Sequence, residues 1–217
     1  MRMLLVALAV VVQTSQAPPL QARFIGQMAF AISDGSTTLM TDFPYQVGYA
    51  GAPPFADGEL RASTQPTLAL ITHRHLDHWE PALFAKTNWK VIAPADAMER
   101  IRTDRVVPFA KRMQFAAIVI EPIETPHHRI GHYSYIVTWH GKRLYFSGDT
   151  ESPDSLLAAT GLDAAFVSSW QYQAARRRGG RIDAKRVVIY HHQAGEQVPG
   201  CTGTCTVPRQ GDTIEIR

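Results

Sequence analysis

The chain has 217 residues and a mass of 24.1 kDa, with 45% hydrophobic and 19% charged residues. This length and composition fit one globular domain and exclude a disordered or fibrous protein. Lys and Arg outnumber Asp and Glu by 22 to 19, a surplus too small to build a nucleic-acid groove or to identify any other partner. The nine histidines are the informative feature, because several of them cluster.

The N-terminus has the pattern of a secretory signal. One positive charge precedes an apolar run over residues 3–12, and Ser15 and Ala17 are the small residues of a cleavage site. This apolar run is too short to cross a bilayer, which takes about twenty residues. We therefore expect residues 1–17 to be a signal peptide, residues 21–217 to form one domain, and the protein to be exported, periplasmic or secreted. No other stretch reaches transmembrane length, so we expect no stable membrane span in the mature protein. A Val-rich edge strand or a disordered start is the alternative interpretation of these N-terminal residues.

From residue 21 onward, short strand patterns alternate with turns and a few helical segments. The turns at Asp34-Gly35 and His140-Gly141 indicate hairpins, and hence two mixed or antiparallel sheets rather than one parallel sheet. The expected strands are Ala22–Ile25, Met28–Ser33, Thr38–Thr41, Thr67–Ile71, Lys90–Ala93, Gln114–Ile120, Tyr133–Trp139, Arg143–Ser147, Ala164–Val167, Arg186–Tyr190 and Thr213–Ile216.

Helices are expected to start at Trp79, near Pro94 and at Ser152, where a Ser N-cap is followed by Pro153. The stretch Phe43–Leu60 is rich in Gly and Pro and predicts a long loop that could wall a site.

A dense group of possible metal ligands directly follows an apolar strand. Within a six-residue turn, the sequence places His73, His75, Asp77 and His78. Imidazole nitrogens and carboxylate oxygens are ligands that zinc prefers besides thiolate. A tight turn can direct some of these side chains at one ion and the others at a second.

Three further segments place polar residues after apolar strands. Each segment alone is weak evidence for a metal ligand, because such residues commonly form turns. Their order along the chain after the first cluster strengthens the interpretation that they supply further metal ligands. The segments are Glu124-Thr125-Pro126-His127-His128-Arg129-Ile130-Gly131-His132, Tyr145-Phe146-Ser147-Gly148-Asp149-Thr150 and Val187-Val188-Ile189-Tyr190-His191-His192.

Together, these four motifs resemble the metallo-β-lactamase fold superfamily of hydrolases. The resemblance spans most of the chain and implies an α/β fold: a four-layer αββα sandwich of two mixed or antiparallel sheets flanked by helices. The opening segment Arg23–Phe30, followed by Thr41-Asp42-Phe43, is similar to a branch with sugar-phosphate lactonases and N-acyl-phosphatidylethanolamine-type phosphodiesterases.

The resemblance also implies a set of ligands for two divalent metal ions. The implied ligands are His73, His75 and His128 for one ion, Asp77, His78 and His191 for the other, and Asp149 as a bridge between them. His128 is preferred to His127 because Thr125-Pro126-His127-His128 aligns with the family's Thr-Pro-Gly-His. His191 closes its strand, and His192 is the alternative.

The function that follows is hydrolysis of an ester, lactone or phosphodiester bond by a hydroxide that bridges two metal ions. Zinc is the expected metal, with manganese or iron as alternatives. Asp77 and Asp149 are expected to be catalytic as well as ligating. Asp149 makes a true β-lactamase the minority alternative, because such enzymes usually lack an aspartate there. A non-catalytic metal-binding protein of the same fold is the other alternative.

The expected partner is a small molecule, and no nucleic-acid partner is expected. The basic run Arg176–Arg181 could attract an anionic substrate. The sequence does not predict the oligomeric state. We expect Asp42 to accept a hydrogen bond from a ligand imidazole. If the protein is exported, Cys201 and Cys205 are expected to form a disulfide.

Overall fold

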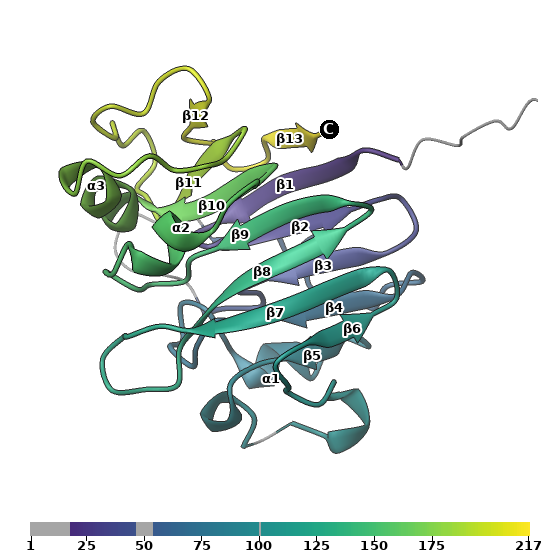
Figure 1. The fold of residues 1–217 in the computed structure, drawn as a ribbon. Helices are drawn as coiled ribbons and strands as arrows, with labels where there is room; N and C mark the ends of the chain where they lie inside the picture. The colour runs from purple at the N-terminus through teal and green to yellow at the C-terminus, as the bar shows by residue number, and fades with distance from the viewer. Residues whose placement is uncertain (1–17, 47–53, 100) are drawn as a thin grey trace, which may run out of the picture.

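The computed structural model describes residues 18–46, 54–99 and 101–217. Two β-sheets lie face to face in it, with short helices on their outer sides (Figure 1). The expected signal peptide and part of the expected long loop lie outside the described residues. Within the described part of the chain, no helix is long and apolar enough to cross a membrane.

The first sheet has six strands in the order β13-β1-β2-β3-β4-β5. Neighbours from β13 to β3 are antiparallel, whereas β3, β4 and β5 are parallel. The strands are β1 (Leu20–Gly26), β2 (Ala29–Ser33), β3 (Thr38–Thr41), β4 (Thr67–Leu70), β5 (Lys90–Ile92) and β13 (Thr213–Ile216).

The second sheet has seven strands in the order β12-β11-β10-β9-β8-β7-β6. Neighbours from β6 to β9 are antiparallel, and those from β9 to β12 are parallel. The strands are β6 (Met113–Phe115), β7 (Ile118–Glu124), β8 (Tyr133–Trp139), β9 (Lys142–Phe146), β10 (Ala164–Ser168), β11 (Val187–Tyr190) and β12 (Cys205–Thr206).

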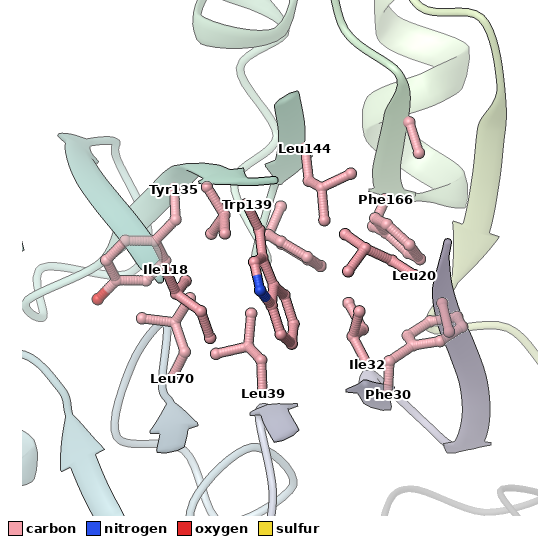
Figure 2. Close-up of a cluster of buried hydrophobic side chains, with 14 of the residues drawn as sticks. Leu20, Phe30, Ile32, Leu39, Leu70, Ile118, Tyr135, Trp139, Leu144 and Phe166 are labelled. Carbon is pink, nitrogen blue, oxygen red and sulfur yellow. The ribbon is translucent and has the colours of Figure 1, made fainter. Parts of the chain in front are cut away.

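The main hydrophobic core lies between the two sheets (Figure 2). Side chains alternate between the faces of a strand, so every second residue of the inner strands points into this space. Trp139 from β8 and Phe166 from β10 meet Leu39 and Phe30 from the first sheet, and all four are fully buried. This shared core fixes the relative position of the two sheets.

Two further apolar clusters cover the outer faces. The short helix α1 (Pro81–Phe84) contributes to the cluster outside the first sheet, and α2 (Asp154–Ala158) and α3 (Ser169–Arg177) cover the second. The resulting layers are helix, sheet, sheet and helix, as the sequence predicted (Figure 1). The described 3₁₀ turns are Asp57–Glu59, Ala95–Ala97 and Thr103–Arg105.

Most predicted strands are present, but one prediction is wrong. The expected strand Gln114–Ile120 is a tight hairpin, because Ala116 has a φ of 49° and reverses the chain between β6 and β7. The turn carries none of the Gly, Asn or Asp residues that usually indicate one. The expected helix near Pro94 is only a 3₁₀ turn.

Helix α3 was not predicted. The sequence feature that could have indicated the start of this helix is Ser168. Its side chain accepts a hydrogen bond from the backbone N–H of Gln171 and so caps the helix.

Candidate metal centre

The four motifs meet at one edge of the sandwich because of the strand directions. The strands β7, β9 and β11 run in the same direction, since β7 and β9 each pair antiparallel with β8, and β9, β10 and β11 are parallel. Their C-terminal ends therefore lie on one side, where the β7–β8 connection and the start of α3 are also found (Figure 1). The segment after β4 brings the first motif to the same place.

The first ligand group consists of His73, His75 and His127. The Nδ1 atom of His75 lies 3.0 Å from His73 Nε2 and 3.3 Å from His127 Nε2. Two imidazole nitrogens on one tetrahedral zinc ion lie about 3.3 Å apart, given Zn–N bonds of about 2.0–2.1 Å. The three side chains thus have the spacing of ligands to a single ion.

The structure places His127, rather than the expected His128, in this group. His128 has a φ of 44° and the next residue, Arg129, a φ of 64°, so they form the tip of a turn closed by a hydrogen bond from Ile130 N to His127 O. His128 is consequently exposed, although its ring lies 4.3 Å from that of His127. The group therefore contains the residue that directly precedes the one expected from the motif alignment.

The second ligand group consists of Asp77, His78, Asp149 and His191. Asp149 Oδ2 lies 3.2 Å from His78 Nε2 and 3.6 Å from His191 Nε2. Asp77 Oδ2 lies 3.6 Å from His191 Nε2 and 3.8 Å from His78 Nε2. All four residues were expected from the sequence. His191, and not His192, belongs to the group.

A hydrogen-bond network behind the site orients two of the histidines. The buried Asp42 accepts hydrogen bonds from the backbone N–H and the hydroxyl of Thr72, at 2.7 and 3.0 Å, and lies 3.2 Å from His78 Nδ1. Because the Thr72 hydroxyl donates to Asp42, it accepts from His73 Nδ1 at 3.0 Å. Both histidines therefore carry the proton on Nδ1 and offer Nε2 to a metal. Asp42 thus lies where it can accept a hydrogen bond from the His78 imidazole.

His132 is a buried residue that the sequence interpretation missed. Its Nε2 accepts a hydrogen bond from the Asp149 backbone N–H at 2.8 Å, so its Nδ1–H donates to the Thr125 hydroxyl, also at 2.8 Å. A side chain at Gly148 would collide with His132, because a Cβ there would lie 2.4 Å from Nε2. His132 thereby holds the turn that presents Asp149.

Gln27 is the second residue that the sequence interpretation missed. It lies in the turn between β1 and β2, its Nε2 donates to Asp77 Oδ2 at 3.2 Å, and its backbone carbonyl accepts from His191 N at 2.8 Å. Trp170, at the start of α3, covers the same group from another side. Its ring lies 4.7 Å from that of His191, and its Nε1 donates to the Asp149 carbonyl at 3.4 Å.

Burial favours the neutral form of the imidazoles in the first ligand group and of the nearby His132. Burial lowers the pKa of His73 far below its usual range, and the nearby His78 lowers it further. The pKa of His127 falls to about 4 and that of His132 to about 3, in both cases mainly because burial disfavours the charged imidazole. Neutral imidazole is the form that binds metal ions.

The second group behaves as a network of opposite charges. Burial acts to raise the pKa of Asp77, but its hydrogen bond with His191 and the charge of His78 lower that pKa to about 2. Burial acts to lower the pKa of His78, yet the carboxylates of Asp149 and Asp42 raise it well above its usual range. The carboxylates of this group thus require positive charge beside them, which a divalent cation would supply.

Unsatisfied atoms provide an independent test of whether metal ions fit. Among the described residues, His78 Nε2 and Asp149 Oδ1 are buried and have no hydrogen-bond partner. Such atoms are costly in a protein interior unless they bind something. Both belong to the second group, and its donor set of imidazole nitrogens and carboxylate oxygens is one that zinc, manganese and iron use. The residues present therefore fit metal ions.

Other predicted features have structural roles. Trp79 is buried and donates to the Ala97 carbonyl at 2.8 Å, so it packs in the interior. In the basic run, Arg176 contacts the Gly200 carbonyl and Arg178 pairs with Asp154. The expected disulfide between Cys201 and Cys205 is present in the structure.

The comparisons with known proteins agree with this fold and site. A model of the beta-lactamase superfamily domain matches residues 48–199, which is more than half of the chain. The chain therefore belongs to the metallo-β-lactamase superfamily, as the sequence motifs predicted.

Individual relatives extend the similarity to most of the chain. A metal-dependent hydrolase of Deinococcus radiodurans is 29% identical over 91% of this chain and 95% of its own length. A metallo hydrolase of the archaeon Ignicoccus hospitalis shares the fold with a TM-score of 0.69 at 16% identity, over 92% of this chain and 99% of that one. A hydroxyacylglutathione hydrolase of Methylobacterium sp. is 36% identical, but only over 37% of this chain and 32% of its own length.

Proposed function

We propose that this member of the superfamily hydrolyses an ester, lactone or phosphodiester bond in a small molecule, with two divalent metal ions, most simply zinc, at the two ligand groups. The observation that carries the proposal is the convergence of two separate groups at one sheet edge. His73, His75 and His127 would hold one ion, and Asp77, His78 and His191 the other, with Asp149 between them.

Bound divalent ions would lower the pKa of a water molecule toward neutrality and stabilise negative charge that develops on the substrate. Other residues of the protein set the protonation and the position of the candidate ligands. Asp42 and Thr72 hold protons on the far side of His78 and His73, and His132 fixes the backbone of Asp149. The Trp170 ring packs edge-on against the His191 ring.

A substrate panel with metal analysis tests the proposal. The purified chain would be loaded with zinc, manganese or iron and assayed on lactones, carboxylic esters, phosphodiesters and a β-lactam. A thioester belongs in the panel because partial relatives are named hydroxyacylglutathione hydrolases. We expect about two metal ions per chain and turnover of one ester-like class. Stoichiometric metal without turnover of any bond would instead support the non-catalytic alternative.

The same proposal includes export of the protein. The disulfide between Cys201 and Cys205 supports it, because such bonds persist in oxidising compartments. Expression of the full chain in a bacterial host, followed by mass measurement of the periplasmic protein, would detect removal of residues 1–17. Retention of the full-length chain in the cytoplasm would contradict this part of the proposal.

A further inference from the structure

Asp96 contacts both of the segments that supply the first ligand group. It belongs to the 3₁₀ turn Ala95–Ala97, which follows β5. Its Oδ2 atom accepts a hydrogen bond from the backbone N–H of Gly131 at 3.1 Å and lies 3.2 Å from Arg74 Nε. Arg74 lies between two candidate ligands of the first motif, and Gly131 lies in the same loop as His127. One carboxylate oxygen therefore connects the two segments.

The loop between β7 and β8, which carries His127, is attached to its surroundings at its base and near its tip. At the base, Tyr133 N donates a hydrogen bond to Thr72 O at 3.1 Å. Nearer to the tip, Gly131 N donates to Asp96. A loop that is held only at its base can pivot about that point. The attachment to Asp96 therefore restrains the position of the His127 ring.

The turn that carries Asp96 is itself anchored to the first motif. Its buried residue Ala97 accepts a hydrogen bond at its carbonyl from the indole N–H of Trp79 at 2.8 Å. Trp79 is buried and directly follows the candidate ligand His78. Asp96 is thus held in a fixed position relative to the first motif. Its bond with Gly131 extends this fixed geometry to the loop.

The close packing around Gly131 indicates why a carboxylate occupies position 96. A Cβ atom at Gly131 would lie 2.8 Å from Asp96 Oδ1, closer than real atoms pack. Oδ1 is buried and has no hydrogen-bond partner among the described residues. An unpaired buried oxygen is costly, and an apolar side chain would avoid that cost. The two contacts of Oδ2 are therefore the physical reason for an aspartate at this position.

A contribution to global stability does not explain the pair of Asp96 with Arg74. Their side chains are 34% and 52% exposed. Ion pairs as exposed as this contribute little to the free energy of unfolding, because water and salt screen the charges. The effect of the pair is therefore local and acts on the spacing of the imidazoles on either side of it.

We propose that Asp96 is a positioning residue for the first ligand group, and that it holds the His127 imidazole at the correct distance from the other two ligands. The inference rests on the proposed function, because it assumes that these three imidazoles bind one metal ion. His127 Nε2 lies 3.3 Å from His75 Nδ1, which is the spacing of two ligands on one ion. Displacement of the loop would lengthen one metal–nitrogen bond and leave the second ligand group unchanged.

Metal affinities measured separately for the two groups test the proposal. The full chain and its Asp96→Ala variant would be loaded with cadmium-113 and titrated with a chelator, while NMR follows the resonance of each ion. The resonance that disappears in His127→Ala identifies the first group. We expect Asp96→Ala to weaken cadmium binding there by about tenfold to a hundredfold, the usual effect of losing a residue that orients ligands. Binding at the second group should be unchanged.

A conservative variant and a matched control accompany this measurement. Asp96→Asn keeps an oxygen that can accept from Gly131 N–H, so we expect it to restore most of the affinity lost in Asp96→Ala. Asp104→Ala removes another exposed Asp–Arg pair from the segment after β5, with Arg102, and should leave both affinities unchanged. Equal affinity in Asp96→Ala and the unaltered chain would overturn the inference. Equal weakening of both groups would also overturn it, since it would indicate a general effect on the fold.

Amide exchange in the metal-free chain distinguishes failure of this inference from failure of the proposed function. We expect the Gly131 amide to exchange at least about tenfold faster in Asp96→Ala, while the Tyr133 amide at the base of the loop keeps its rate. Faster exchange at Gly131 in a chain that binds no cadmium would support placement of the loop by Asp96 and contradict the proposed function. Two bound ions with unchanged exchange and affinity in Asp96→Ala would leave the proposed function standing and overturn the inference.

Discussion

The backbone conformation after β7 determines which of two adjacent histidines lies beside His73 and His75. His127 has its side chain in the group, whereas the left-handed backbone of His128 and Arg129 turns the chain outward. Sequence motifs fix the order of ligands well but do not encode the local φ angles of a turn. The register of this segment could therefore be decided only from the structure.

Metal content of two neighbouring variants tests this assignment. In His127→Ala, we expect the loss of about one bound zinc ion per chain, because one of three imidazole ligands is removed. His128→Ala is the matched control, since it removes an exposed imidazole from the same turn and should keep the full metal content. Inductively coupled plasma mass spectrometry after dialysis would measure both. Loss of metal only in His128→Ala would restore the assignment expected from the sequence.

Asp149 should be indispensable for hydrolysis but not for folding. Its carboxylate faces His78 and His191, and one oxygen has no partner among the described residues. We expect Asp149→Ala to lower kcat by at least about 10³-fold, because the proposed bridge between the two metal ions is lost. The far-ultraviolet circular dichroism spectrum should be retained. Turnover near that of the unaltered protein on a true substrate would show that Asp149 is not required.

At the scale of elements, two turns connect the sheets. Asp34 in the β2–β3 turn accepts hydrogen bonds from the backbone of Ser36 and Thr37, each at 2.8 Å. Its other oxygen accepts from His140 Nε2 in the β8–β9 turn at 2.7 Å. The sequence identified both turns from Asp34-Gly35 and His140-Gly141, but it could not show that they contact each other, because 106 positions separate the two residues.

The contact between these turns predicts a pH dependence of stability. Burial acts to raise the pKa of Asp34, but hydrogen bonds from His140, Ser36 and Thr37 lower that pKa well below its usual range. A folded-state pKa below the unfolded value of about 3.9 stabilises the fold above that pH, and the contribution is lost as the pH falls. We expect Asp34→Asn to lower the free energy of unfolding near pH 7 by about 1 kcal/mol, from the weakened hydrogen bonds.

Urea unfolding at several pH values would test this dependence. The difference in unfolding free energy between Asp34→Asn and the unaltered protein should shrink between about pH 5 and pH 2. Asp104→Asn is the control, because the Asp104 side chain is exposed and pairs with Arg102 at the surface. A difference that stays constant over this range would show that the Asp34 carboxylate is not the titrating group.

The disulfide should order the 192–210 segment more than it stabilises the whole domain. Cys201 and Cys205 are four positions apart, and closing so short a ring contributes only about 2 kcal/mol in the chain-entropy model. In the Cys201→Ser, Cys205→Ser double variant, we expect faster amide exchange in residues 192–204 and a modest decrease in Tm. Mass measurement before and after thiol alkylation would verify the bond in the exported protein. Two free thiols there would contradict it.

For the whole molecule, the sequence predicted the fold class and most members of the two candidate ligand groups, because both depend on short local patterns. Apolar strands followed by polar residues identify strand ends, and the order of the ends matches a known superfamily. Two features depended on contacts between segments distant in the sequence and could not be inferred. They are the support of Asp149 by His132 and the contact of Gln27 with Asp77. The β6–β7 hairpin was missed for a local reason, because its turn carries no Gly, Asn or Asp.

The arrangement of strands also explains why chemistry gathers at one edge. Three strands of the second sheet end on the same side, and the segment after β4 reaches it from the first sheet. The shared core between the sheets fixes the distance between these ends. A rigid frame of this kind is suited to hold the seven side chains of the two candidate ligand groups in place before any substrate binds.

An anomalous diffraction experiment on zinc-loaded crystals tests the central claim most directly, because it locates metal ions without reference to activity. We predict two peaks about 3.5–4 Å apart, the separation used by two-metal hydrolytic sites. One should contact His73, His75 and His127, and the other Asp77, His78 and His191, with Asp149 touching both. A single peak, or zinc bound away from these side chains, would contradict the account.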